Sequence, residues 1–262
     1  MTTLVIGAGS GMGAATARRL ATRGRLLLAD VNGAAAEKVA AEIGGGAEAA
    51  SCDITLPDQI ASLLGRVEEL DTLVLTAGVA SGSRLPGRTI LEVNLRGTAR
   101  VLAAVEDILA PGACVVCFAS TAGHMVPDLA PIAAVLDDPL SDRFFDDLVE
   151  AGVDLDDALT CYGYSKLGVM RQVRRLAGPW GAKGARILSL SPGAVETPMS
   201  RAEAELHEIM HEFVRSTPLA RWGRPEEVAA VVEFLTSDHA GFMTGSDVLV
   251  DGGQRSMPEW TP

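Results

Sequence analysis

Seven short apolar runs, separated by segments of helical character, constrain the fold of this chain more than any other feature of its sequence. Val, Leu and Ile fill the runs without polar alternation, so we expect strands that are buried on both faces. Strands that alternate with helices are joined by right-handed crossovers and lie parallel. The predicted strands are Thr3–Gly7, Arg25–Asp30, Ala47–Asp53, Asp71–Thr76, Ala113–Ser120, Ala185–Ser191 and Asp247–Asp251. The pattern predicts an α/β fold of the doubly wound (Rossmann) type, a seven-stranded parallel sheet with helices on both faces.

Length and composition fit a single domain that covers residues 1–262. Hydrophobic residues make up 48% of the chain and charged residues 21%, so a large core is available. The formal net charge of -12 would repel nucleic-acid phosphates and anionic membranes. No signal-like segment precedes the first predicted strand, and no apolar stretch reaches the ~20 residues that span a bilayer. We therefore expect a cytoplasmic protein whose partner is a small molecule rather than nucleic acid or a membrane.

The four cysteines are expected to act as small buried hydrophobic residues in a reducing compartment. They are Cys52, Cys114, Cys117 and Cys161. Cys114 and Cys117 form a C-x-x-C pair, but they lie inside a predicted strand, where residues three apart point to opposite faces. The pair is therefore not expected to bind a metal or to act in redox chemistry.

Candidate functional residues gather at one edge of the predicted sheet. A doubly wound sheet binds its ligand at the carboxyl ends of the strands, so the residues that end or follow each run are the candidates. These residues are Gly7–Gly13, Asp30, Asp53, Ala77 with Gly78, Ser120, and Pro192 with Gly193, in the order of the first six strands.

The glycine cluster after the first strand has the pattern of a pyrophosphate-binding loop. Gly7, Gly11 and Gly13 give G-x-x-x-G-x-G, and an Ala-rich helix follows. Without side chains the backbone can approach a pyrophosphate, and the helix N-terminus supplies free N–H groups and partial positive charge. A tight turn that binds no ligand would also use these glycines.

Asp30, at the end of the second strand, favours NAD over NADP. Its carboxylate is placed to accept hydrogen bonds from the adenosine ribose and would repel a 2′-phosphate. No Arg or Lys stands near it at Ala8, Gly9, Ser10, Val31 or Asn32. The alternative is that Asp30 only caps the next helix, which would leave the choice of cofactor open.

Tyr162 and Lys166 carry the predicted proton-transfer chemistry. Four residues apart on a helix, they share one face. A free phenol has a pKa near ~10, so it is a poor base at neutral pH unless a nearby cation favours the phenolate. Lys166 and an oxidised nicotinamide ring would both supply positive charge. Tyr164, whose i+4 partner is Gly168, is expected to pack in the core or the pocket wall.

Together these motifs resemble the short-chain dehydrogenase/reductase family over essentially the whole chain. The resemblance implies a catalytic tetrad of Asn94, Ser120, Tyr162 and Lys166, in which Asn94 holds a water behind Lys166 and Ser120 binds the substrate oxygen. It also implies cofactor contacts by Gly7, Ser10, Gly11, Met12, Gly13, Asp30, Val31, Asp53, Ile54, Ala77, Gly78, Tyr162, Lys166, Pro192, Gly193, Val195 and Thr197. Thr76 departs from the family, which usually has Asn before the Ala-Gly pair.

Residues 124–158 form an insertion with nine Asp and Glu150 against a single Arg143. Asp138-Pro139 predicts a helix start, Phe144, Phe145, Leu148 and Val149 an apolar stripe, and Gly152 a helix stop. This helix is either a solvated surface element or a subunit contact or substrate cover. The insertion and the chain's ending look most similar to bacterial 3α-hydroxysteroid dehydrogenase/carbonyl reductases, in which the insertion alters subunit association. A homo-oligomer, dimer or tetramer, is expected.

Residues 195–215 are expected to form a substrate lid. They contain His207-Glu208-Ile209-Met210-His211, which matches the zinc-hydrolase motif H-E-x-x-H. A zinc hydrolase would not explain the strand-end motifs, so no metal is expected. The apolar residues Met199, Leu206, Ile209, Met210 and Phe213 favour an apolar substrate such as a steroid or another cyclic alcohol, although core packing explains them equally well.

The sequence thus predicts an NAD-dependent oxidoreductase that interconverts a secondary alcohol and a ketone. Two alternatives stay open. One is an NADPH-dependent ketoreductase of a biosynthetic pathway, against which Asp30 argues. The other is a nucleotide-sensing module without turnover, against which the retained Tyr162 and Lys166 argue.

Overall fold

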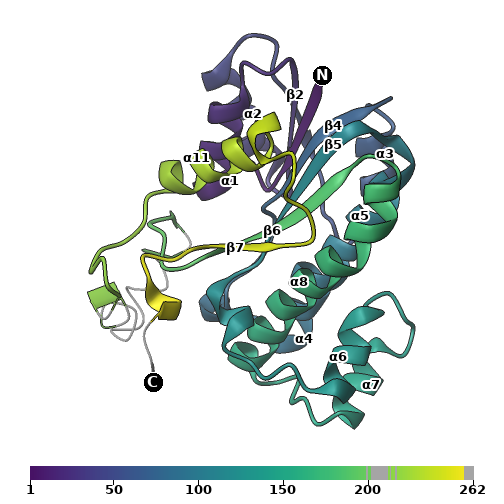
Figure 1. The fold of residues 1–262 in the computed structure, drawn as a ribbon, viewed down its shortest axis with the longest axis vertical. Helices are drawn as coiled ribbons and strands as arrows, with labels where there is room; N and C mark the ends of the chain where they lie inside the picture. Colours follow the sequence, from purple (N-terminus) through teal and green to yellow (C-terminus); the bar gives the residue numbers. More distant parts are fainter. Residues whose placement is uncertain (199, 202–211, 213, 216, 257–262) are drawn as a thin grey trace.

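The chain folds around a seven-stranded parallel sheet with the strand order β3-β2-β1-β4-β5-β6-β7 (Figure 1). The computed structural model describes residues 1–198, 200, 201, 212, 214, 215 and 217–256. The strands are β1 (Thr2–Ile6), β2 (Arg25–Asp30), β3 (Glu48–Ser51), β4 (Leu70–Leu75), β5 (Leu109–Phe118), β6 (Arg186–Pro192) and β7 (Asp247–Val250). All seven predicted strands are confirmed, and so is the doubly wound α/β fold.

The largest boundary error concerns β5, which begins at Leu109 rather than at Ala113. Leu109 pairs with Leu70, and the register then shifts so that Cys114 pairs with Thr72. Gly112 within this irregular stretch has a φ of 86°, a conformation that glycine adopts without strain. Because the bulge interrupts the continuous apolar run, the sequence pattern did not indicate that β5 begins at Leu109.

Helices cover both faces of the sheet (Figure 1). One hydrophobic cluster packs beneath α1, α2 and α11, and a second packs beneath α3, α5 and α8. The helices are α1 (Gly11–Leu20), α2 (Gly33–Ile43), α3 (Pro57–Leu64), α4 (Gly87–Leu91), α5 (Thr98–Val105), α6 (Ala130–Asp137), α7 (Phe144–Glu150), α8 (Ala158–Ala182) and α11 (Pro225–Leu235). None of the helices in the described residues is long and apolar enough to cross a bilayer.

All four cysteines are buried and unpaired, as expected. Cys114 and Cys117 lie in β5 and belong to different hydrophobic clusters, one on each face of the sheet. Burial raises the pKa of the Cys114 thiol to about 11 and that of Cys117 to about 12. The reactive thiolate is therefore disfavoured at both positions.

The insertion contains two short helices, α6 and α7. The prediction that a helix begins at Asp138 is wrong, because Asp138 ends α6, and its N–H donates to the carbonyl of Val135. The buried side chains of Ile132 and Leu136 already commit the preceding residues to a helix. A turn then separates α6 from α7, which ends before Gly152 as predicted, where φ is 92°.

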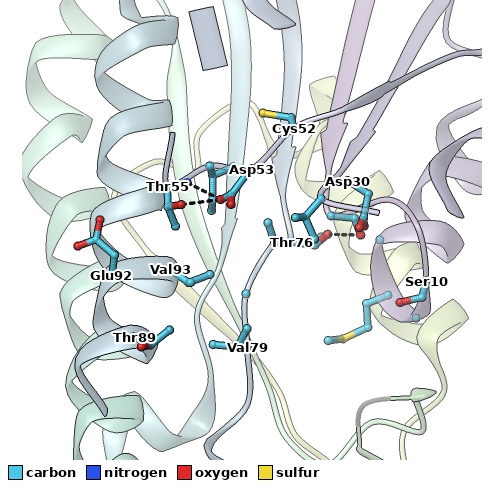
Figure 2. Close-up of a pocket in the computed structure, with 18 of the residues that line it drawn as sticks. Ser10, Asp30, Cys52, Asp53, Thr55, Thr76, Val79, Thr89, Glu92 and Val93 are labelled. Carbon is cyan, nitrogen blue, oxygen red and sulfur yellow. Dashed lines mark hydrogen bonds between the residues drawn. The ribbon is translucent and has the colours of Figure 1, made fainter. Parts of the chain in front are cut away.

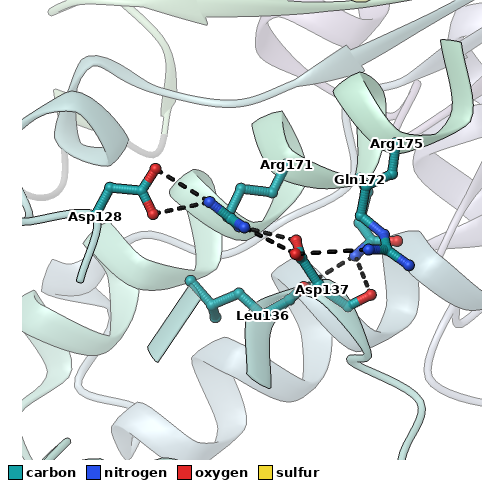
Figure 3. Close-up of polar contacts among 6 residues, drawn as sticks. All are labelled: Asp128, Leu136, Asp137, Arg171, Gln172 and Arg175. Carbon is teal, nitrogen blue, oxygen red and sulfur yellow. Dashed lines mark hydrogen bonds and ion pairs between the residues drawn. The ribbon is translucent and has the colours of Figure 1, made fainter. Parts of the chain in front are cut away.

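Polar contacts attach α6 to the long helix α8 (Figure 3). The Arg171 guanidinium donates to both carboxylate oxygens of Asp137 at 2.8 Å and to Asp128 at 2.9 and 3.1 Å. Gln172 donates from Nε2 to the carbonyl oxygens of Leu136 at 2.9 Å and Asp137 at 3.2 Å, which would otherwise be unpaired at the end of α6. Part of the insertion's acidic charge is thus neutralised by α8.

Candidate active site

The turn from β1 into α1 brings bare backbone to the carboxyl edge of the sheet. Gly7 and Gly11 have φ values of 92° and 52°, which only glycine adopts readily. A methyl group on Gly7 would lie 2.5 Å from the backbone nitrogen of Ala77, and one on Gly13 would overlap the carbonyl of Gly7. The glycines therefore let α1 start directly beside β1 and β4.

The N-terminus of α1 is open toward the cavity. Ser10 is the N-cap residue, but its side chain makes no capping hydrogen bond. The first N–H groups of a helix have no partner inside it, so they can bind an anion. This arrangement fits the pyrophosphate of a nicotinamide dinucleotide.

Asp30 lies in the same cavity at the end of β2. Its carboxylate oxygens accept hydrogen bonds from the N–H groups of Gly9 at 2.8 Å and Asn32 at 2.9 Å. The N-cap of α2 is Asn32, whose side chain accepts from the N–H of Ala35. The alternative that Asp30 merely caps the next helix is therefore wrong, and its carboxylate is fixed facing the cavity.

These residues line a cavity of about 800 Å³. Figure 2 shows Ser10 and Asp30 on one side of it, Thr55, Thr89, Glu92 and Val93 on the other, and Asp53 between them. The predicted cofactor residues found in its lining are Gly7, Ser10, Gly11, Met12, Gly13, Asp30, Val31, Asp53, Ile54, Ala77, Gly78 and Thr197. Most of the predicted cofactor contacts thus share one cavity.

Other predicted residues lie outside this lining. They are Asn94, Ser120, Tyr162, Lys166, Pro192, Gly193 and Val195. Of the proposed lid, residues 199, 202–211 and 213 lie outside the described residues, and with them the H-E-x-x-H motif and the apolar stripe. Among the described residues, no group of His, Cys, Asp and Glu could hold a metal ion.

Several lining residues were not predicted from the sequence. They are Cys52, Thr55, Thr76, Val79, Arg88, Thr89, Glu92, Val93 and Phe145. The spacing of Thr89, Glu92 and Val93 on one helical face, just before Asn94, was a usable signal. Phe145 belongs to the insertion and carried no such signal.

Thr76, the departure from the family pattern, has a structural role. Its hydroxyl lies 2.9 Å from the carbonyl oxygen of Ile6 and 3.1 Å from that of Gly7, and donates to this pair. It thereby ties the end of β4 to the glycine turn. The Thr76 hydroxyl therefore stabilises the junction between β4 and the glycine turn at the edge of the cavity.

Helix α8 carries Tyr162 and Lys166 on one face, as the spacing predicted. Asp157 caps the helix by accepting from the N–H groups of Leu159 and Thr160. The Lys166 Nζ lies 5.7 Å from the centre of the Tyr162 ring. Tyr164 is only 5% exposed and packs in the core, as expected.

Lys166 is buried, and in the part of the chain that the structure describes it is not paired with a carboxylate. Its Nζ donates to the carbonyl oxygen of Phe118, at the end of β5, at 3.1 Å. Loss of hydration lowers its pKa from 10.5 to about 8. The ammonium is therefore held close to Tyr162 at a considerable electrostatic cost.

Asn94 lies in a π-helical turn, η2 (Glu92–Gly97), between α4 and α5. Its Oδ1 accepts from the N–H of Val79 at 2.8 Å, and its Nδ2 donates to the carbonyl of Val79 at 2.9 Å. Nδ2 also lies 3.3 Å from the hydroxyl of Ser165 on α8. Asn94 thus holds the segment after β4 beside the helix that carries Lys166, while its water-holding role stays a prediction.

Ser120 begins a short 3-10 turn, η4 (Thr121–His124), after β5, and its hydroxyl accepts from the N–H of Ala122 at 3.2 Å. At the end of this turn, Nε2 of His124 lies 2.7 Å from Oδ2 of Asp247. The other oxygen of Asp247 accepts from the hydroxyl of Ser191 at 3.0 Å. These contacts anchor the segment that carries Ser120 to β6 and β7.

Comparison with known proteins gives consistent matches along the chain. A family profile described as short chain dehydrogenase matches residues 1–131, and one described as enoyl-(acyl carrier protein) reductase matches residues 151–255. The short-chain dehydrogenase/reductase bsc3 of Alternaria brassicicola is 32% identical over 96% of this chain and 94% of its own length. The 3-alpha-hydroxysteroid dehydrogenase/carbonyl reductase of Comamonas testosteroni is 30% identical over 74% of this chain and 76% of its own. The crystal structure of levodione reductase superposes with a TM-score of 0.76 at 28% identity, covering 97% of each chain.

Proposed function

The chain belongs to the short-chain dehydrogenase/reductase family and is an oxidoreductase that acts on alcohols and ketones, and we propose that it uses NAD to interconvert a secondary alcohol and a ketone. The observation that carries the choice of NAD is the fixed carboxylate of Asp30 in the cavity. A carboxylate there accepts from the two hydroxyls of an unmodified ribose and repels a 2′-phosphate.

A bound nicotinamide cofactor would supply the hydride-transfer chemistry, and the chain's own residues would move the proton and hold the substrate. The Tyr162 hydroxyl exchanges the proton with the substrate oxygen, and Ser120 donates a hydrogen bond to that oxygen. Lys166, held by the carbonyl of Phe118, places positive charge beside Tyr162. Asn94 keeps Val79 in place next to this pair.

We propose an apolar cyclic alcohol, such as a hydroxysteroid, as the substrate class. Support comes from the apolar character of the segment after Thr197 and from similarity to the Comamonas testosteroni enzyme. A screen of hydroxysteroids and small cyclic alcohols for NAD reduction tests this class. Turnover confined to small polar polyols would contradict it.

Fluorescence titration with NADH and NADPH tests the cofactor. We expect the wild type to bind NADH about 10-fold to 100-fold more tightly, because the like charge of the partly buried Asp30 costs roughly 1–3 kcal/mol against the 2′-phosphate. Asp30→Ala should remove most of this preference. Equal affinity of the wild type for both cofactors would contradict the role given to Asp30 and favour the NADPH-dependent ketoreductase.

Substitution of Tyr162 tests the catalytic assignment. Tyr162→Phe keeps the ring and removes the hydroxyl, so NADH binding should persist while turnover falls by about 10²-fold to 10⁴-fold. Tyr164→Phe on the same helix is the matched control and should turn over normally. A wild type that binds NADH but turns over no alcohol or ketone would favour the nucleotide-sensing alternative.

We also propose a cytoplasmic homo-oligomer. Four buried, unpaired thiols support a reducing compartment. Exposed apolar side chains near the sheet edge at β7, among them Phe242 and Leu249, support a subunit contact. Light scattering coupled to gel filtration tests the oligomer, and a monomer at micromolar concentration would contradict it.

A further inference from the structure

The insertion reaches into the proposed cofactor cavity. Phe145, in the first turn of α7, lines the cavity together with Arg88 of α4. We propose that Arg88 and Phe145, stacked on each other, form one surface (the clamp) against which the adenine ring of the cofactor packs, an inference that rests on the proposed nucleotide-dependent function. The acidic insertion would then be part of the cofactor site.

The two side chains form a stacked pair. The guanidinium carbon of Arg88 lies 3.9 Å from the centre of the Phe145 ring, well within the range of a cation–π contact. Within the described part of the chain, no carboxylate lies within ion-pair distance of Arg88. A planar cation on an aromatic ring offers a flat surface that suits stacking or edge contact with a purine base.

The position of Arg88 and Phe145 in the cavity indicates that they contact the adenine end of the cofactor. The open N-terminus of α1 would hold the pyrophosphate, and Asp30 would hold the adenosine ribose. The base then extends from Asp30 past Asp53 toward the opposite wall, which Thr89 of α4 and Val93 of η2 form (Figure 2). Arg88 and Phe145 line this cavity, whereas the catalytic Ser120 and Tyr162 do not.

The ring of Phe145 is held in place by its neighbours. It packs edge-to-face against the fully buried Phe144, with ring centres 5.1 Å apart. The Arg96 guanidinium lies 5.3 Å from both rings and donates to the carbonyl of Ser141 at 3.0 Å. Glu92 pairs with Arg96 at 2.9 Å, which completes the support. A surface that is ordered before binding loses little entropy when the base docks.

Dissociation constants for NADH and for each half of the molecule, AMP and reduced nicotinamide mononucleotide, test the clamp. Phe145→Ala and Arg88→Gln should each raise the Kd for NADH by about 3-fold to 30-fold, the range of a cation–π or stacking contact. The Kd for reduced nicotinamide mononucleotide, which lacks the adenosine, should stay unchanged, and the Kd for AMP should rise with that for NADH. Val149→Ala on the exposed side of α7 and Arg18→Gln on α1 are matched controls that should change none of these constants.

Two results would contradict the proposed adenine contact. If both variants bound NADH and AMP as tightly as the wild type, the pair would only anchor the insertion. If both variants lost affinity equally for NADH and for reduced nicotinamide mononucleotide, the substitutions would have distorted the whole site. A wild type that binds NADPH but not NADH would contradict the choice of NAD and not the clamp, because both cofactors carry adenine, and the variants are then titrated with NADPH. A wild type that binds neither cofactor nor AMP would overturn both proposals.

Discussion

Two walls of the same cavity are built in different ways. The wall at the strand ends, from Gly7 to Gly13 and Asp30, presents backbone groups whose positions follow from the sheet itself. The opposite wall, on α4, η2 and α7, presents long side chains such as Arg88, Glu92 and Phe145. The first wall has almost no room for an added atom, because its backbone groups are closely packed. The shape of the second wall depends on how elements far apart in the sequence pack together.

This difference predicts two kinds of response to substitution. A change in the strand-end wall meets backbone, which cannot move without disturbing the sheet, and should act nearly all-or-none. A change in the side-chain wall meets flexible groups and should have a graded effect. Substitutions in each wall therefore test this contrast.

Gly13→Ala should have the largest effect. The added methyl group would overlap the carbonyl of Gly7 and lie 2.6 Å from the hydroxyl oxygen of Thr76, so α1 must shift away from β1. We expect a loss of about 1–3 kcal/mol in the free energy of unfolding from overpacking. We also expect at least about 100-fold lower kcat/KM, because the displaced helix no longer positions the cofactor. Urea unfolding and steady-state kinetics measure the two effects.

Gly181→Ala is the matched control for this substitution. Gly181 lies in α8 with nothing within 4 Å of an added methyl group. Alanine there should stabilise the protein by about 0.4–1 kcal/mol, because it restricts the unfolded chain and suits a helix. If Gly13→Ala behaved like Gly181→Ala, the strand-end wall would be adaptable and the contrast between the walls would fail.

Lys166 of α8 lies outside the cavity lining and reaches the end of β5, and its burial predicts a pH-dependent stability. Its pKa is lowered from 10.5 to about 8 in the folded chain. Between these values the unfolded state binds more protons than the folded state, so stability rises as the pH rises. At ~1.4 kcal/mol per pKa unit, the free energy of unfolding should increase by about 3 kcal/mol across this window, measured relative to Lys166→Met.

Urea unfolding of the wild type and Lys166→Met at several pH values between 7 and 11 measures this difference. Lys183→Met is the control, since Lys183 follows the same helix, is half exposed and pairs with Glu106. Its difference from the wild type should stay flat over the same window. A flat difference for Lys166→Met would mean that the ammonium is solvated rather than buried.

The contrast between the walls also explains how far the sequence could predict the molecule. The strands and the glycine turn follow from local rules, since apolar runs mark strands and positive φ requires glycine. The position of Asp30 followed from the strand that it ends. By contrast, Phe145 enters the cavity only because α7 and the preceding Ser141 dock against Arg96, a tertiary contact that no local pattern encodes.

The errors have the same origin. The Asp138-Pro139 pair resembles a helix start, but the burial of Leu136 had already placed the preceding residues in α6. The bulge before Cys114 concealed the true start of β5, because register depends on the neighbouring strand. In both cases packing overrode a correct local preference.

The smallest effect is expected where the insertion docks on α8. Arg171→Lys keeps the charge but loses the planar fork that binds Asp137 and Asp128 (Figure 3). We expect the free energy of unfolding to fall by about 1 kcal/mol, the value of a partly buried bidentate pair. The kcat/KM should change less than about threefold, because Lys166 is held by its own bond to the carbonyl of Phe118 rather than by the insertion.

Urea unfolding and steady-state kinetics of Arg171→Lys, Asp137→Asn and the double variant measure this docking. The two single losses should not add, since each removes the same pair. Arg143→Lys is the matched control, because Arg143 is more exposed and its partners, Asp147 and Glu150, lie in α7, the helix that Arg143 itself precedes. It should be indistinguishable from the wild type. If Arg171→Lys instead lowered kcat/KM as far as Gly13→Ala, the insertion would have to hold helix α8 as rigidly as the sheet holds the glycine turn. The two walls would then differ in composition but not in stiffness.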